Sequence, residues 1–496
     1  MQHGINERRI LRRRFFRATA SALGAALLFP RRGLAAESKR AFFDGLDDAG
    51  REVMDQARRD IERIRKGDFK LRVVDGDGKP VAAPIELQHV RHEFRFGGPF
   101  SENPLFNDLF NSGRMNPHWG VIQKAEDGPD GAYQWEHFDK MLNAAHARDV
   151  SMRWHCLIYE EHGTPRWIDA KYNGQPWWKD VPETEGQWWK LIERHLREVG
   201  THKRPGDGKP LGEFLEFDVI NETGSRMWTN LRLEAAGKPA AFPSAHNRHP
   251  RGWANAARMI TLARQYMPKS RLVALEPWPV GDLNNGMTKR VLGHFAKLFD
   301  RQSDDPLIRQ VAEDPQVLLG CQGHTGVHDR AALTMARINE CFERFSQFGK
   351  EIAITEYDPP CVPKDKPPEE FERTRLMPEE QAAWSVNFYT LAFSKPYIGE
   401  LMRWCWADGQ SMKRDAGIVF QDFRPKPEYF ALKQLLTETW TTRWEGPLAA
   451  DGSASFRGFF GTYEVSVPGY EPARLRWNSD SPRDVRVELT RQSVKG

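Results

Sequence analysis

The sequence predicts an α/β protein built around a (β/α)8 TIM barrel, with a small accessory β-sandwich made of N- and C-terminal strands. Between residues 93 and 440, short apolar runs alternate with stretches of helical period, and several of these runs end abruptly in polar side chains. Such runs are typical of buried parallel strands whose C-terminal ends open into a site. A doubly wound open sheet is the competing fold, but no glycine-rich phosphate loop follows a predicted strand.

The barrel strands are expected at short runs of apolar and β-branched residues. They cover residues 94–96, 119–123, 151–159, 214–221, 271–275, 317–324, 351–356 and 401–406. Between and after them, apolar residues recur with helical spacing. The predicted helices cover residues 135–148, 185–199, 253–266, 288–299, 332–348, 378–393 and 429–440. This alternation predicts a barrel over residues 93–440.

The flanking segments predict a helix and a small β-domain. Residues 37–92 contain a charged, amphipathic helix at 41–66 and then two alternating strands, 70–74 and 85–92, around an acidic, glycine-rich turn. A calcium loop is the alternative for that turn, but the later glutamate of an EF-hand is missing, and a hairpin is favoured. Residues 441–496 contain further strand-like segments, which we expect to pair with this hairpin.

Residues 1–36 are expected to be an export signal and not part of the fold. A basic stretch at 12–17 precedes an apolar stretch at 18–29 and small residues at 33–36, the order found in secretory signal peptides. The paired arginines followed by phenylalanine resemble a twin-arginine signal. A basic, membrane-touching or disordered tail is the alternative, and the apolar stretch is too short to span a bilayer. We therefore expect export to the periplasm or beyond the cell.

Composition excludes several classes of protein. The 496 residues are 40% hydrophobic and 28% charged, as in a soluble globular protein. The first 36 residues hold eight arginines and one glutamate, so the rest carry a formal net charge of −3 instead of the +4 of the whole chain. The basic balance thus belongs to the signal, and we expect no nucleic-acid partner, no membrane association and a monomer. The five cysteines fit no metal-ligand spacing and are expected to be structural thiols.

Two predicted strands each deliver a glutamate to their C-terminal end. Residues 217–222 read F-D-V-I-N-E and residues 352–358 read I-A-I-T-E-Y-D, which places Glu222 and Glu356 at these ends. In a barrel of parallel strands the C-terminal ends share one face, and two carboxylates there suit cleavage of a glycosidic bond. Either segment alone could be a barrel strand with an incidental acid. The two glutamates together, in this order along the chain, favour a catalytic role.

With the strands placed, the sequence resembles glycoside hydrolase family 10, whose principal members are endo-β-1,4-xylanases on (β/α)8 barrels. The resemblance extends over about residues 70–467. Within the family, the sequence is most similar to the branch common in plants. Its motifs are R-V-V-D-x-x-G-K-P-V at 72–81, R-H-x-F-x-F-G at 91–97, a counterpart of R-G-H-C-I-F-W-E at 153–160, and F-R-G-F-x-G-T-Y at 456–463.

The resemblance implies roles for individual residues. Glu222 matches the general acid/base and Glu356 the nucleophile, while Asn221 matches the residue that holds the sugar 2-hydroxyl. Gln322 and His324 match a Q-x-H motif whose histidine orients the nucleophile, with Asp358 matching the aspartate that holds this histidine. The matched sugar-binding residues are His155, Trp404, Lys124, Glu160 and Tyr159. For Glu160 a solvated loop acid is nearly as good an interpretation, and Trp406 fits either the cleft or barrel packing.

Two strands depart from the family pattern. The second strand reproduces the W-x-V start of its sugar-gripping set but not the asparagine or final tryptophan, so Lys124 is carried over with an open register. The fifth strand reads L-E-P-W where N-D-Y-N is usual, and Tyr159 stands where tryptophan is usual. The cleavage residues are intact while the residues for specificity are altered.

The resemblance implies an exported retaining endo-1,4-β-xylanase that needs no cofactor and no metal and acts on xylan or a related polysaccharide. A retaining glycosidase on another β-glycan is the first alternative, because the second and fifth strands differ. A catalytically silent, carbohydrate-binding barrel is the second, although a mere binder has no use for the glutamate pair and its histidine and aspartate. A metal hydrolase fits least, because no His-x-x-x-His spacing is present.

Overall fold

The structure is a computed structural model. It describes residues 43–126, 131–159, 163–165, 167–168, 182–224, 237, 252–277, 280–281, 283–325, 333–371, 375–411 and 413–492, with only the backbone for 182–188. The chain divides into two units, Met1–Ala41 and Phe42–Gly496, and all described residues belong to the second. The predicted signal segment 1–36 and the predicted sugar-binding Glu160 lie outside the described residues.

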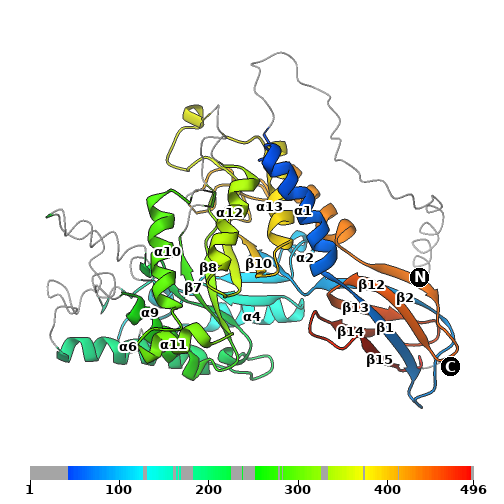
Figure 1. The fold of residues 1–496 in the computed structure, drawn as a ribbon. Coiled ribbons are helices and arrows are strands. Elements are labelled where there is room, and N and C mark those ends of the chain that lie inside the picture. Colours follow the sequence, from blue (N-terminus) through cyan, green and yellow to red (C-terminus); the bar gives the residue numbers. More distant parts are fainter. Residues whose placement is uncertain are drawn as a thin grey trace, which may run out of the picture. The chain divides into compact units, whose positions relative to one another are not determined.

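Eight parallel strands close into a barrel, which confirms the predicted fold (Figure 1). Chain order and spatial order agree, and β10 closes the ring by pairing with β3. The strands are β3 (Arg95–Pro99), β4 (Ser112–Met115), β5 (Ser151–Trp154), β6 (Glu216–Asn221), β7 (Arg271–Glu276), β8 (Val317–Cys321), β9 (Ile352–Tyr357) and β10 (Ile398–Arg403). All residues of β6, β8 and β9 are buried, as expected for strands covered on both faces.

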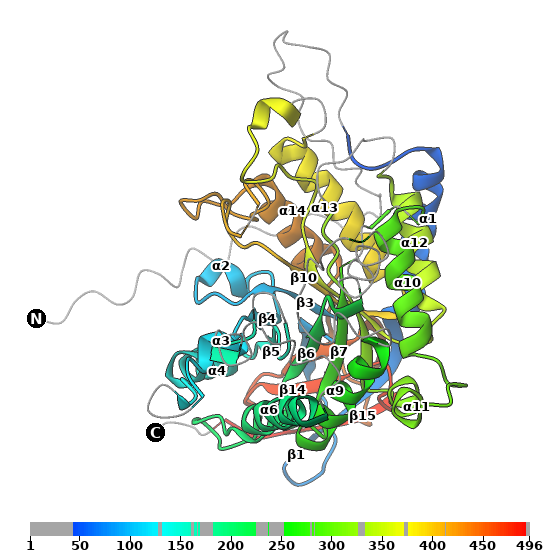
Figure 2. The same ribbon diagram turned by 90° about the vertical axis from the view of Figure 1, so that its left-hand side faces the viewer.

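Helices surround the barrel, as Figures 1 and 2 show. Those described are α1 (Asp48–Ile64), α2 (Pro104–Asn107), α3 (Trp119–Ile122), α4 (Glu136–Ala147), α6 (Pro182–Thr201), α9 (Gly252–Tyr266), α10 (Gly286–Leu298), α11 (Pro306–Glu313), α12 (Met335–Ser346), α13 (Pro378–Phe393) and α14 (Pro427–Gln434). Short 3-10 turns cover η2 (Leu211–Glu213) and η3 (Pro368–Phe371), and a π-helical turn, η4 (Leu435–Thr439), continues α14. Of these, α2, α11 and the two 3-10 turns were not predicted from the sequence, and α3 was predicted as a strand.

Local sequence explains why α1 forms where it does. The side chain of Asp47 accepts a hydrogen bond from the amide of Gly50 and so caps the first turn. Met54, Ala57 and Ile61 then recur every three or four residues and are buried, which gives the helix one apolar face. This face packs near α12 and α13 on the outside of the barrel.

The second barrel strand lies elsewhere than predicted. Residues 119–122 form the short helix α3, and the strand is β4, Ser112–Met115. Trp119 is buried, and its indole nitrogen donates to Gln123 Oε1 at 2.7 Å, a contact between residues four apart that suits a helical turn. The prediction was wrong because an apolar run as short as W-G-V-I fits a buried strand and a buried helical turn equally well.

The segments flanking the barrel form two antiparallel or mixed sheets. The three-stranded sheet has the order β12-β1-β15, and the four-stranded sheet has the order β11-β2-β13-β14. Their strands are β1 (Lys66–Asp75), β2 (Pro84–His92), β11 (Arg443–Pro447), β12 (Ser453–Phe459), β13 (Gly461–Ser466), β14 (Ala473–Trp477) and β15 (Asp484–Leu489). Inward side chains from both sheets, among them Leu71, Leu87 and Trp477, share one hydrophobic core. The prediction that N- and C-terminal strands combine into a small β-sandwich is confirmed.

The predicted hairpin between the first two strands is wrong. β1 pairs with β12 and β15, whereas β2 pairs with β11 and β13, so the two lie in different sheets. The acidic turn between them does form: the side chain of Asp75 accepts hydrogen bonds from the amides of Asp77 and Lys79. The chain folds back on itself only beside the turn, where Val74 forms an antiparallel bridge with Pro80, and it then crosses to the other sheet.

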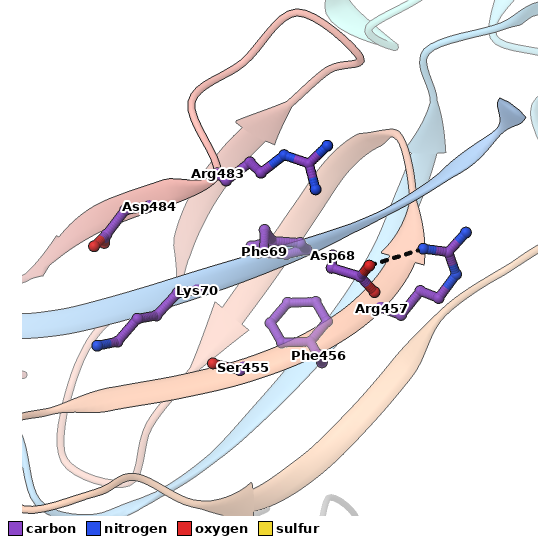
Figure 3. A pocket seen from close by; sticks show the side chains of 8 residues that line it. All are labelled: Asp68, Phe69, Lys70, Ser455, Phe456, Arg457, Arg483 and Asp484. Atoms are coloured by element: carbon purple, nitrogen blue, oxygen red, sulfur yellow. Dashed lines mark hydrogen bonds and ion pairs between the residues drawn. The ribbon is translucent and has the colours of Figure 1, made fainter. Parts of the chain in front are cut away.

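The three-stranded sheet also carries a shallow hollow beside β1, shown in Figure 3. An ion pair of 3.1 Å joins Arg457 to Asp68 across the sheet. The remaining lining residues are Phe69, Lys70, Ser455, Phe456, Arg483 and Asp484.

None of the helices that the structure describes has the length and apolar character needed to cross a membrane.

Candidate active site

Glu356 lies near the C-terminal end of β9 and is 3% exposed. Its Oε2 is 2.9 Å from His324 Nε2, and its Oε1 is 3.4 Å from His155 Nε2. Burial raises the pKa of Glu356, but His155, His324 and Arg114 together outweigh burial and hold the pKa below its usual value. The carboxyl group is therefore ionised at neutral pH, as a nucleophile requires.

His324 follows β8 and connects Glu356 to Asp358. Its Nδ1 is 3.1 Å from Asp358 Oδ2, and Asp358 is fully buried. Burial lowers the pKa of His324, yet the hydrogen bonds to Asp358 and Glu356 raise it to about 9. The imidazole is thus cationic at neutral pH and donates to both carboxylates, which orients Glu356 and stabilises its charge.

A second histidine–aspartate pair lies on the other side of Glu356. His155 follows β5 and is 2% exposed, and its Nδ1 is 2.9 Å from Oδ2 of Asp218 in the middle of β6. Each oxygen of Glu356 therefore faces a histidine that an aspartate holds from behind. Asp218 was not predicted as a site residue, although an acid inside the apolar run F-D-V-I was a signal for it.

Trp404 and Arg114 complete the surroundings of Glu356. The ring of Trp404 meets the rings of His155 and His324 edge to face, with centroids 5.7 and 5.6 Å away. The Arg114 guanidinium lies 3.9 Å from the centre of the Trp404 ring and donates to the Trp404 carbonyl at 3.0 Å. Arg114 comes from β4, the strand that was misplaced from the sequence, and for this reason it was missed.

Glu222 directly follows β6, and its backbone adopts a left-handed conformation with φ 61°. Its Oε1 accepts a 2.8 Å hydrogen bond from Gln322 Nε2, and the hydroxyl of Tyr159 lies 3.5 Å from the same oxygen. Gln322 also lies 3.4 Å from Asn221 Oδ1. A left-handed backbone is uncommon for a residue with a Cβ and is found where the surrounding structure imposes it, often at functional sites.

Gln322 connects the two glutamates. While its side chain donates to Glu222, its backbone carbonyl accepts a 2.7 Å hydrogen bond from the amide of Glu356. Glu222 and Glu356 therefore both contact one residue at the C-terminal mouth of the barrel. This arrangement places two carboxylates and their hydrogen-bonding neighbours on the face where barrel enzymes carry their sites.

A buried charge network lies directly below this site. Arg153 on β5 is fully buried and contacts the carboxylates of Glu216, Asp218 and Glu400, which come from β6 and β10. Burial lowers the pKa of Arg153, but these three carboxylates together raise it above its usual value. Because Asp218 contacts both Arg153 and His155, the network anchors the second histidine–aspartate pair.

Most of the residues that we predicted for the site lie together. Glu222, Glu356, Asn221, Gln322, His324, Asp358, His155, Tyr159 and Trp404 are linked by the contacts above. Lys124 is exposed, in the loop after α3, and its role stays a prediction. In the described ranges no group of three or more histidine, cysteine or carboxylate side chains is arranged to hold a metal ion. The five cysteines are all buried, as predicted for structural thiols, and within the described residues none of them is in a disulfide.

Part of the chain is similar to a known protein family. Residues 106–302 match the family model of Glycosyl hydrolase family 10. The matched segment begins in α2 and ends after α10. It includes Glu222, His155 and β4, the strand whose position was predicted wrongly from the sequence. Glu356, His324 and Trp404 lie beyond it, so their similarity to the family rests on the motifs and on the geometry described above.

Among solved structures, the native xylanase 10B from Thermotoga maritima is similar, with a TM-score of 0.50 and 17% identity over 70% of this chain and 96% of that one. A xylanase 10B from Thermotoga petrophila, determined with xylobiose, has a TM-score of 0.49 and 16% identity over 70% of this chain and 95% of that one. The first of these likenesses supports the fold.

A curated relative has a different kind of name. The anti-sigma-I factor RsgI6 of Acetivibrio thermocellus is 24% identical over 433 residues, which make up 85% of this chain. The chain spans only 47% of that relative's length. The region of RsgI6 that is similar to this chain is thus about half of RsgI6.

Proposed function

We propose that this protein is a retaining glycoside hydrolase that cleaves β-1,4-xylosidic bonds in xylan. The observation that carries the proposal is the contact of both glutamates with Gln322 at the mouth of a barrel whose sequence matches a glycosyl hydrolase family. Retaining enzymes need one carboxylate as nucleophile and a second carboxyl group as acid and base. The environments of Glu356 and Glu222 suit these two roles.

In the first step, Glu356 attacks the anomeric carbon and forms a glycosyl ester, while the bond to the leaving oxygen breaks and Glu222 gives that oxygen its proton. In the second step, Glu222 removes a proton from water, the water oxygen attacks the same carbon, and the ester bond to Glu356 breaks. His155 and His324 keep Glu356 ionised for the first step and stabilise it as a leaving group in the second.

Trp404 is positioned to hold the reacting sugar. Its side chain is only partly buried, and it packs against the two histidines that face Glu356. An aromatic face in this position suits the apolar face of a pyranose ring. His155, Asn221 and Tyr159 line the same mouth and supply hydrogen-bonding groups.

The test is incubation of the full chain with a panel of xylans and β-glucans, following the anomer first released by NMR. We expect hydrolysis of xylan with initial release of the β-anomer, and loss of turnover in Glu356→Gln. Initial release of the α-anomer would contradict the retaining mechanism, and hydrolysis of a β-glucan in preference to xylan would favour the alternative substrate. Unchanged turnover in Glu356→Gln would overturn the assignment of the nucleophile.

Binding of a polysaccharide without turnover is the second candidate. It is favoured by the curated relative, whose name describes a regulator and not a hydrolase. Affinity electrophoresis in xylan separates the two functions: a binder is retarded in the gel but releases no sugar. We also propose export through the N-terminal signal, which fractionation of cells producing the full chain would test.

A further inference from the structure

Glu276 is the last residue of β7 and is fully buried beside the strand end that carries Glu222. Its Oε1 accepts a 2.7 Å hydrogen bond from the amide of Gly224, two residues after Glu222. Its backbone carbonyl accepts a 3.3 Å hydrogen bond from the amide of Gln322, whose side chain donates to Glu222. These two contacts of Glu276 lead to Glu222, one along the backbone and one through Gln322.

The backbone around Glu222 needs such support. A left-handed conformation is unfavourable for a residue with a Cβ and persists only where neighbouring contacts hold it. The amide of Glu222 donates to the carbonyl of Leu275 at 2.9 Å, and the amide of Gly224 donates to Glu276. Two consecutive residues of β7 thus hold the chain at Glu222 and just beyond it.

The packing around Gly224 leaves this amide little freedom. A Cβ at position 224 would lie 2.3 Å from Cγ of His294, so the backbone runs directly against that ring. His294 comes from α10 and is fully buried, and burial lowers its pKa to about 4, so the ring is neutral at pH 7. Its Nε2 is 3.7 Å from Glu276 Oε1, beyond hydrogen-bond distance. Packing against His294 and the hydrogen bond to Glu276 therefore together hold Gly224 in place, and Glu276 is the partner that its amide has.

We propose that Glu276 is a positioning residue for the general acid Glu222, acting by holding the amide of Gly224 and thereby the direction in which the Glu222 carboxyl group meets the glycosidic oxygen. The inference rests on the proposed glycosidase function and goes beyond it. It also gives a role to the fifth barrel strand, whose L-E-P-W departs from the family pattern. Glu276 itself contacts neither the sugar nor the other glutamate in this account.

The role predicts a specific kinetic signature. General acid catalysis matters most when the leaving group is a strong base, because such an oxygen must be protonated as the bond breaks. Phenoxide is a strongly basic leaving group, whereas 2,4-dinitrophenoxide departs without a proton. Displacement of Glu222 therefore slows release of phenol and leaves release of dinitrophenol almost unaffected. The parameter kcat/KM isolates this first step, since it excludes the later hydrolysis of the glycosyl ester.

The experiment compares Glu276→Leu, which removes the acceptor, with Glu276→Gln, which keeps an oxygen for the Gly224 amide. Both variants of the full chain are assayed on phenyl and 2,4-dinitrophenyl β-xylobiosides. In Glu276→Leu we expect kcat/KM to fall at least about tenfold on the phenyl substrate and less than about twofold on the dinitrophenyl substrate. In Glu276→Gln both values should stay within about threefold of the wild type.

Equal losses on the two substrates in Glu276→Leu, or no loss on the phenyl substrate, would overturn the inference. So would a loss in Glu276→Gln as large as in Glu276→Leu. If Glu276→Leu does not fold, as judged by thermal melting, Glu276→Asp decides by the same selective loss, because its shorter side chain withdraws the acceptor. A wild-type chain that hydrolyses neither substrate refutes the proposed function and the inference together, a result distinct from failure of the inference alone.

Discussion

Nε2 of Gln322 donates a 2.8 Å hydrogen bond to Oε1 of Glu222, while the Gln322 backbone accepts one from Glu356. A single residue at the end of the sixth barrel strand thus fixes the side chain of Glu222, the proposed acid/base, relative to the strand that carries Glu356, the proposed nucleophile. The distance between two catalytic carboxyl groups decides whether a glycosidase retains or inverts. A fixed distance between Glu222 and Glu356 requires rigid support, and Gln322 supplies it because it contacts both residues.

Replacing Gln322 by leucine should therefore impair turnover. The variant removes the amide that orients Glu222 while keeping a similar volume, and misplacement of a catalytic group by about 1 Å can cost on the order of a hundredfold. We expect kcat on xylan to fall between about tenfold and a hundredfold. Gln347→Leu, at an exposed position after α12, is the control and should keep wild-type kcat. Equal kcat in the two variants would contradict the role of Gln322.

Trp404→Ala should weaken binding of the polysaccharide. The variant removes the aromatic surface beside His155 and His324, so we expect KM on xylan to rise by about tenfold, with a smaller change on a short aryl glycoside. Trp444→Ala is the matched control, because Trp444 lies on β11 in the accessory sheet and stacks on Phe456. If KM changes as little in Trp404→Ala as in this control, the ring of Trp404 does not stack on the bound sugar.

His324 makes stability depend on pH in the alkaline range. Its pKa is raised to about 9 in the folded protein, against about 6.5 in an unfolded chain. The folded state thus binds the proton more tightly, so this stabilisation is fully present below about pH 6.5 and is lost as the pH rises through 9. We expect the melting temperature to fall between these pH values, and to fall less in His324→Gln. His146→Gln, at an exposed position on α4, should behave like the wild type.

Arg153→Met should destabilise the whole barrel. The variant leaves Glu216, Asp218 and Glu400 buried without their shared cation, and breaking a buried pair costs roughly 3–5 kcal/mol. Urea unfolding at pH 7 measures the loss. Arg457→Met is the control: its ion pair with Asp68 is exposed, and we expect a change of at most about 1 kcal/mol. Similar unfolding midpoints for the two variants would show that the network contributes little.

Much of the barrel and of its site could be predicted from the sequence, because apolar runs of about six residues that end in polar side chains have few other interpretations. The strands that end at Glu222 and Glu356 are of this kind, and the histidine–aspartate pair of His324 and Asp358 follows from its motif. The second strand could not be found in this way. Its four residues, S-G-R-M, contain neither β-branched nor aromatic side chains, and Arg114 within it is compatible with the interior only because of Trp404 and the buried acids.

Contacts between distant strands were equally beyond prediction. Asp218 and Glu276 are single acids inside or at the end of apolar runs, and nothing local shows that one binds a histidine and the other a backbone amide. The pairing of β1 was mistaken for a similar reason. Alternating strands around a turn predict a hairpin. In the structure, however, both edges of β1 pair with C-terminal strands, β12 on one side and β15 on the other.

The position of β1 has a consequence for synthesis of the protein. Its two neighbours, β12 and β15, are contributed by residues 453–459 and 484–489, about four hundred positions further along the chain. During synthesis, β1 therefore has both of its edges unpaired until residues 453–489 have been made. An unpaired strand edge can pair with another chain, so throughout that interval β1 is a site at which aggregation can begin.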